Sequence, residues 1–179
     1  IYVEGGGVTA ENCMYDRNYS FGVRGEANAV LNLTNNEFSE VRSKSGSDGF
    51  DIWFAADTTL TSSSNLFIDS YTSAFNGESG LVFTSTNDVI TGSESGFLLE
   101  NSPGTITDVS MSGIFKFGIS AESSGDLVLT NVEVLTDPET SKLSSSGTDG
   151  SIGIYSIDTN LDVASSTISG NNGYGIFAV

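Results

Sequence analysis

The chain has 179 residues, and its 6 Lys and Arg against 23 Asp and Glu give a formal net charge of −17 at pH 7. Nucleic acid is excluded as a partner because the chain offers no basic surface for phosphates, and anionic membranes are expected to repel it. An apolar fraction of 37% with 11 Phe and 6 Tyr is enough for a folded core. Cys13 is the single cysteine, so an internal disulfide is excluded, and its side chain is expected to be buried.

Two short patterns alternate along the chain and form a repeating unit. The first is Gly followed by a few mostly apolar residues, and it occurs at Gly22, Gly49, Gly80, Gly96, Gly118, Gly153 and Gly175. The second is an alternating segment that ends in a polar residue, with a large apolar residue three positions later. It occurs at 8–15, 31–38, 127–134 and 161–168, with a weaker copy at 106–111. Alternation with period two predicts strands that bury one face.

The spacing of this unit predicts the fold class. Two intervals between the glycines are 22 residues, which is typical of a solenoid coil, and the longer intervals indicate loop insertions. We therefore expect an all-β protein, a right-handed single-stranded parallel β-helix of about seven coils. Equivalent side chains of successive coils then lie about 4.8 Å apart and form ladders. No long segment keeps a helical apolar stripe, so no helical cap is expected.

A polar residue ends each alternating segment and is expected to mark a corner of the coil. Asn tolerates the left-handed backbone conformation that a sharp corner needs, and its side chain can satisfy backbone groups of the turn. The expected structural ladder consists of Asn12, Asn35, Asp108, Asn131 and Ser165.

Three segments rich in Ser, Gly and Thr are expected to be loop insertions, near residues 42–47, 70–79 and 137–150. The segments at Ile1 and before Val179 both resemble interior strands. We therefore expect residues 1–179 to be one β-helix domain, either part of a longer array or a unit that associates end to end through open strand edges.

The chain contains no His, which excludes Ser-His-Asp and Cys-His catalysis and leaves carboxylate chemistry. The segment Asp48-Gly49-Phe50-Asp51-Ile52 resembles the motif of the polygalacturonase-type glycoside hydrolases, which are parallel β-helices. The resemblance implies Asp48 as a catalytic acid, with Asp51 and Asp69 as further candidates. The other motifs of that family are missing, so the sequence does not favour an enzyme.

Carboxylates in turns and loops are the donors that Ca²⁺ prefers, so calcium is the one cofactor that the sequence suggests, although none is required. Candidate ligands are Asp48, Asp51, Asp57, Asp137, Glu139 and Asp149. The alternative is that these carboxylates are solvated surface charges.

Trp53 is the single Trp, and alternation with Ile52 and Phe54 predicts that it points outward and offers its ring to a ligand. A face that binds ice or mineral is a further alternative. Regular T-x-T ladders are not evident in the sequence, and this counts against it.

The repeat and the segment Asn171-Asn172-Gly173-Tyr174-Gly175-Ile176 resemble β-helical surface proteins, including pectate-lyase-like and autotransporter passenger domains. That resemblance implies a non-catalytic structural or adhesive module located outside the cell or on its surface. The expected partners are carbohydrate or other surface proteins of the cell. Direct insertion into the membrane is not expected. The alternative is a polysaccharide-active enzyme, a hydrolase or lyase of acidic glycans, that is degenerate or incomplete in this chain.

Overall fold

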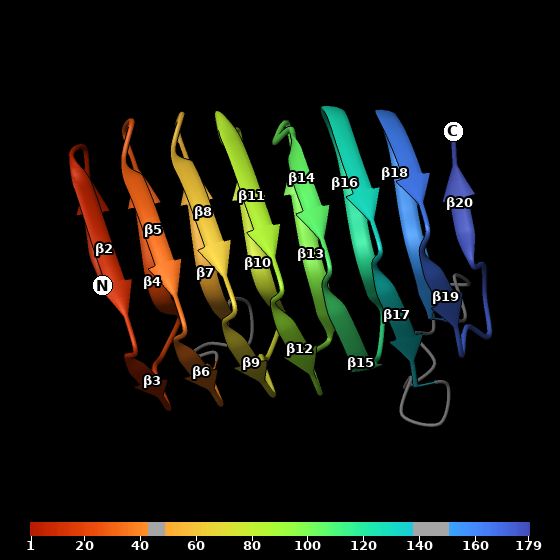
Figure 1. Ribbon diagram of the computed structural model, residues 1–179, viewed down its shortest axis with the longest axis horizontal. Coiled ribbons are helices and arrows are strands. Elements are labelled where there is room, and N and C mark those ends of the chain that lie inside the picture. The colour runs from red at the N-terminus through yellow and green to blue at the C-terminus, as the bar shows by residue number, and fades with distance from the viewer. Residues whose placement is uncertain (43–48, 138–150) are drawn as a thin grey trace.

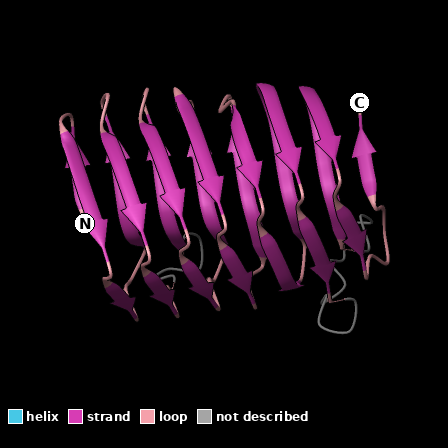
Figure 2. Ribbon diagram, viewed as in Figure 1, coloured by secondary structure: helices cyan, strands magenta, loops and turns pink. Residues whose placement is uncertain are grey.

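The computed structural model describes residues 1–42, 49–137 and 151–179, and within them every regular element is a strand (Figures 1 and 2). The expected insertions near 42–47 and 137–150 lie almost entirely outside these residues. Among the described residues, no helix is long and hydrophobic enough to span a bilayer.

The coils from β1 to β19 contribute a strand segment to each of three faces of the solenoid, and β20 adds a last strand to the first face (Figure 1). The first face contains β1 (Tyr2–Glu4), β4 (Phe21–Glu26), β7 (Phe50–Ala55), β10 (Ser73–Glu78), β13 (Ser95–Glu100), the first part of β16 (Phe117–Thr130), the first part of β18 (Ile152–Ala164) and β20 (Ile176–Ala178). The second face contains β2 (Gly7–Glu11), β5 (Val30–Thr34), β8 (Thr59–Ser63), β11 (Val82–Thr86), β14 (Gly104–Thr107) and the remaining parts of β16 and β18. The third contains β3 (Met14–Asp16), β6 (Glu37–Ser39), β9 (Leu66–Ile68), β12 (Val89–Thr91), β15 (Ser110–Ile114), β17 (Glu133–Thr136) and β19 (Thr167–Ser169).

All strand pairs of the described residues are parallel, and each strand pairs with its equivalent in the next coil. Because β16 and β18 continue around a corner, the first and second faces form one continuous sheet. The prediction of an all-β parallel β-helix is therefore confirmed.

The core consists of the apolar ladders that alternation predicts. Tyr15, Phe38 and Phe67 are in register on the third face, and their rings stack with centroids 4.5 and 5.0 Å apart. Phe75 and Phe97 stack in the same interior at 4.5 Å. Each fully buried Phe stabilises the fold by about 2 to 3 kcal/mol through apolar area removed from water.

The coil register corrects two of the expected glycine positions. Gly96, Gly118 and Gly153 are equivalent, but the coils before them place Ala74 and Asp51 in that position, rather than Gly80 and Gly49. The expected insertion at 70–79 is wrong for the same reason, because it contains strand β10, which is buried from Ser73 to Gly77. Its polar and small residues gave it the composition of a loop although they pack as a strand.

The expected corner residues all occupy one corner between the second and third faces. Asn12, Asn35, Asp108, Asn131 and Ser165 have φ values of 55, 52, 54, 54 and 52°, and Ser64 and Asn87 complete the row with 56 and 54°. This is the left-handed conformation that favours Asn at such positions. Along this row the described residues contain one side-chain hydrogen bond, from Asn131 Nδ2 to Asp108 Oδ1 at 2.6 Å.

The buried polar ladder lies one residue later, at Asn36, Asn65 and Asp88. Asn36 N donates to Asn65 Oδ1 at 2.8 Å, and Asn65 N donates to Asp88 Oδ1 at 2.7 Å. Cys13 precedes Asn36 in this row, and its backbone N donates to Asn36 Oδ1. The Cys13 side chain is exposed in the first coil of the stack, which corrects the expectation that it is buried.

Candidate functional site

The outward side chains of the first face form the most varied chemical surface of the described residues. Three rows run across its strands. The middle row is Tyr2, Arg24, Trp53, Asn76, Leu98, Ser120, Tyr155 and Phe177. One neighbouring row holds the partly exposed Phe21 and Phe117 and the buried Phe50, Ser73, Ser95 and Ile152. The other neighbouring row holds Glu4, Glu26, Ala55, Glu78, Glu100, Glu122 and Ile157.

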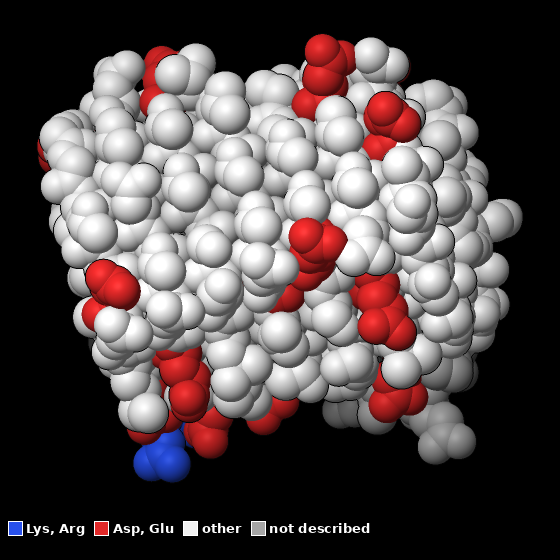
Figure 3. Space-filling view, in the orientation of Figure 1, with Lys and Arg blue, Asp and Glu red and all other residues white. Residues whose placement is uncertain are grey.

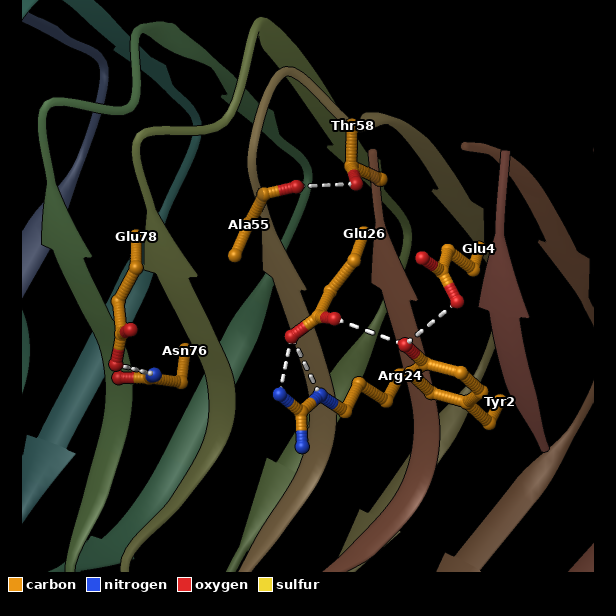
Figure 4. A network of polar contacts seen from close by, with 8 residues as sticks. All are labelled: Tyr2, Glu4, Arg24, Glu26, Ala55, Thr58, Asn76 and Glu78. Atoms are coloured by element: carbon orange, nitrogen blue, oxygen red, sulfur yellow. Dashed lines mark hydrogen bonds and ion pairs between the residues drawn. The ribbon is translucent and has the colours of Figure 1, made fainter. Parts of the chain in front are cut away.

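A first aromatic cluster surrounds Arg24, and Figure 4 shows Arg24 with Tyr2 and Glu26. The Arg24 guanidinium carbon lies 3.5 Å from the ring centroid of Trp53 and 5.1 Å from that of Phe21, and the Trp53 and Phe21 rings stack at 5.1 Å. Tyr2 contributes a further ring, 5.6 Å from the same carbon. A guanidinium over an aromatic face is attracted by the ring quadrupole, so the cluster is held both by stacking and by charge.

Glu26 fixes the orientation of this cluster. Its carboxylate accepts hydrogen bonds from Arg24 Nε, at 2.9 Å, and from Arg24 Nη2, and it also accepts one from the Tyr2 hydroxyl at 3.0 Å. The bonds from Arg24 and then from Tyr2 lower the pKa of Glu26, and the bond to Glu26 raises the pKa of Tyr2. At neutral pH the Arg24 charge is therefore paired within the cluster.

Trp53 lies on the outer side of β7, between the inward Ile52 and Phe54. Its ring is only partly exposed, because Arg24 and Phe21 pack against it. Its indole Nε1 is buried and has no hydrogen-bond partner among the described residues. Alternation thus gives the correct side of the strand, but not the Arg24 side chain that covers the ring.

A second aromatic cluster lies at the other end of the face. The rings of Phe117 and Tyr155 are 5.5 Å apart, those of Tyr155 and Phe177 stack at 5.5 Å, and Tyr174 contacts Phe177 at 5.4 Å. Four strand separations of about 4.8 Å lie between β7 and β18, so about 19 Å separates Trp53 from Tyr155.

Between the two clusters, the middle row holds Asn76, Leu98 and Ser120, of which Leu98 is partly exposed. Asn76 and Ser120 are only 7% and 8% exposed, whereas Glu78, Glu100 and Glu122 in the neighbouring row are exposed. Asn76 Nδ2 donates to Glu78 Oε1 at 2.9 Å (Figure 4). No Lys or Arg of the described residues pairs with these three glutamates. The central part of the face therefore presents carboxylate acceptors beside a row that holds two recessed polar side chains and Leu98.

Asp51, a candidate from the sequence, points into the core and is fully buried. Its Oδ2 accepts a hydrogen bond from Ser70 Oγ, and its Oδ1 has no partner among the described residues. Burial raises the pKa of Asp51 well above 3.8. The carboxyl is out of reach of a polysaccharide or a solvated cation, which corrects its assignment as a catalytic or calcium-binding residue.

Asp69 has a left-handed backbone at an exposed corner, next to the buried Ser70 that contacts Asp51. It lines an open depression of about 550 Å³ together with Glu40, Arg42 and Tyr71. Asp69 therefore lies outside the corner and Asp51 inside it, so the two do not form a pair that acts on one substrate. Asp48, the acid implied by the polygalacturonase resemblance, lies outside the described residues.

The expected calcium ligands are dispersed or lie outside the described residues. Asp51 and Asp57 lie near opposite ends of β7, Asp137 follows β17, and Glu139 and Asp149 are outside. Within the described ranges, no three Cys, Asp or Glu side chains are arranged to hold a metal ion.

The glutamate row was missed from the sequence because its members belong to different coils. Glu78, Glu100 and Glu122 are 22 positions apart, a spacing that equals one coil and could have revealed them. Arg24 and Glu26 alternate on one strand, a pattern that is too common to single out a site.

Comparison with known proteins identifies a structural neighbour but no sequence relative. No protein-family model matches the chain, and no curated protein matches its sequence. Among solved structures, it is similar to a point mutant of the periplasmic alginate epimerase AlgG, with a TM-score of 0.66 and 12% identity. The match covers 99% of this chain and 46% of the epimerase chain, so the chain spans less than half of its neighbour's length. At this identity, the likeness supports the parallel β-helix fold alone.

Proposed function

We propose that the chain is a non-catalytic module, exported from the cytoplasm, that binds a neutral or amino-bearing polysaccharide along its first face. The observation that carries this proposal is the pair of aromatic clusters, around Trp53 and around Tyr155, at the two ends of the row that holds Asn76, Leu98 and Ser120. Aromatic rings pack on the apolar faces of sugars, and a few polar groups between them fix the orientation of the chain.

The charge of the face limits the class of polysaccharide. Glu78, Glu100 and Glu122 have no cationic partner among the described residues, and Arg24 is already paired with Glu26. A polyanion such as alginate would be repelled by this row and by the net charge of −17. Sugar hydroxyls and ammonium groups, in contrast, can donate to carboxylates.

Isothermal titration calorimetry with three soluble oligosaccharides tests the proposal. We expect saturable binding of cello-oligosaccharide or of chitosan oligosaccharide, and none of alginate oligosaccharide. Tyr155→Ala should weaken the binding, because it removes the centre of the second cluster. Tyr71→Ala is the matched control, since Tyr71 is 51% exposed but lies outside the first face. Binding that is equally weakened by both variants would contradict the proposal.

The second candidate is a polysaccharide-active enzyme, which the fold similarity to an epimerase and the row of adjacent carboxylates favour. Paired carboxylates are the usual acid and base of glycoside hydrolysis. Incubation with polygalacturonate, alginate and chitosan separates the two candidates. New reducing ends, unsaturated products or epimerised residues that disappear in Glu100→Gln would establish the enzyme, whereas binding without any product supports the module.

A further inference from the structure

The second face carries rows of hydroxyl side chains that neither candidate function uses. Its outward positions form one row of Thr9, Asn32, Thr61, Thr84, Thr105 and Val128, and a parallel row of Glu11, Thr34, Ser63, Thr86, Thr107 and Thr130. Every one of these residues is at least partly exposed. The two rows lie side by side on the same strands, so each of β8, β11 and β14 presents two hydroxyl groups outward.

This face lacks charge over its central strands. No outward residue of β5, β8, β11 or β14 is ionisable, although the chain as a whole has a net charge of −17. Figure 3 views this face and shows no acidic or basic side chain over β5, β8 and β11. Glu11, Asp126 and Asp162 lie on strands nearer its borders.

The rows are regular in two directions. Strands β2, β5, β8, β11 and β14 pair residue for residue without a register shift. Over β8, β11 and β14, hydroxyls therefore repeat about every 4.8 Å from coil to coil and about every 6.6 Å from one row to the next. Thr is β-branched and stiff at χ1, so these groups lose little freedom when they bind a surface.

The chemistry of the face identifies its partner. A face without charge among its central strands does not match an ionic mineral or a charged polymer. Its outward rows contain no aromatic ring, so they lack the stacking groups that a crystalline polysaccharide would need. The partner must therefore match uncharged hydrogen-bonding groups that repeat over similar distances in two directions. A plane of ice is such a partner.

We propose that the second face binds ice through its two hydroxyl rows. The Thr hydroxyls hydrogen-bond to waters at positions of the ice lattice. The methyl groups of the same Thr residues and the exposed Val30 and Val82 restrict the water layer between the face and the ice. The alternating pairs Thr61/Ser63, Thr84/Thr86 and Thr105/Thr107 are in register and form a hydroxyl ladder that was not evident in the sequence, because coil lengths differ and only the register aligns them.

Thermal hysteresis and ice recrystallisation of the purified chain test this proposal. We expect the wild-type chain to shape ice crystals and to open a gap between melting and freezing temperatures. Thr84→Tyr, in the centre of the rows, should lose most of that gap because a large ring prevents flat contact. Ser112→Tyr, an equal substitution on the third face, should keep it. Circular dichroism melts of both variants verify that they are folded.

Two results would overturn the proposal. One is the absence of thermal hysteresis and of recrystallisation inhibition in the folded wild-type chain. The other is adsorption to microcrystalline cellulose or chitin that Thr84→Tyr abolishes, since this would make the second face a polysaccharide surface. Because Tyr155 lies on a different face, Tyr155→Ala should leave the effect on ice unchanged, so this proposal and the proposed function fail separately.

Discussion

Asn65 and Asp88, one coil apart, are joined by two buried hydrogen bonds in which both donors belong to Asn65. Asp88 Oδ1 lies 2.7 Å from Asn65 N and 3.2 Å from Asn65 Nδ2. Asn65 Oδ1 accepts the same pair of bonds from Asn36, at 2.8 and 2.9 Å. The ladder therefore satisfies backbone and side-chain donors at a corner that is closed to water, and it ends in a carboxyl group.

Asp88→Asn is expected to stabilise the protein at neutral pH. Burial, the largest cause, raises the pKa of Asp88, so its charged form is unfavourable in the folded state. Asn at this position can accept from Asn65 and donate to Ser85 Oγ, as Asn65 Nδ2 donates to Ser62 Oγ at 2.9 Å. We expect the free energy of unfolding in urea to rise by about 1 kcal/mol at pH 7. A decrease would contradict this role of the carboxyl.

Asn65→Ala is expected to destabilise the fold by roughly 2 to 3 kcal/mol, because it removes the acceptor of the buried backbone N of Asn36 and the bond from Asn65 Nδ2 to the carbonyl of Leu33. The matched control is Asn32→Ala, which removes a partly exposed amide from the second face. The control should change the free energy of unfolding by less than about 0.5 kcal/mol. Equal effects in urea denaturation would mean that the ladder contributes nothing specific.

Asp51 predicts a pH dependence of stability. Its pKa is raised in the folded state, so the folded protein binds a proton more tightly than the unfolded chain does. The contribution of this group is fully present below the ordinary carboxyl pKa of 3.8 and is lost as the pH rises through the raised value. Asp51→Asn should therefore gain stability relative to wild type as the pH increases from about 4 to 8. Urea denaturation at several pH values checks this, and a difference that does not vary with pH would refute it.

Gly118 is required for the close approach of neighbouring coils. A Cβ atom there would lie 2.4 Å from Val134 Cγ1 and 2.5 Å from the carbonyl oxygen of Gly153. Gly118→Ala is expected to lower the free energy of unfolding by about 2 to 3 kcal/mol through overpacking. Gly7→Ala serves as the control, because its nearest neighbour would be Val30 O at 3.6 Å. A thermal melt that shifts equally for both variants would contradict this account.

The interior of the fold could be predicted from the sequence, whereas most of the candidate site could not. Alternation around Leu31 and Phe38 places their side chains correctly inside, because one buried face leaves a period of two. Strand β10 was missed because Ser73, Asn76 and Gly77 have a turn-like composition and take their strand conformation from the coils on either side. The glutamate and threonine rows depend on register between coils, which insertions of different length conceal in a linear sequence.

Trp53 offers the most direct test of the proposed polysaccharide site, because it is the single Trp and lies in the first aromatic cluster. The measurement is a titration of its fluorescence with cello-oligosaccharide, chitosan oligosaccharide and alginate oligosaccharide. We predict a saturable change with at least one of the first two, weakened in Tyr155→Ala and preserved in Tyr71→Ala, and no change with alginate. An emission that responds to none of the neutral or amino-bearing glycans, or to alginate alone, would contradict the proposed function.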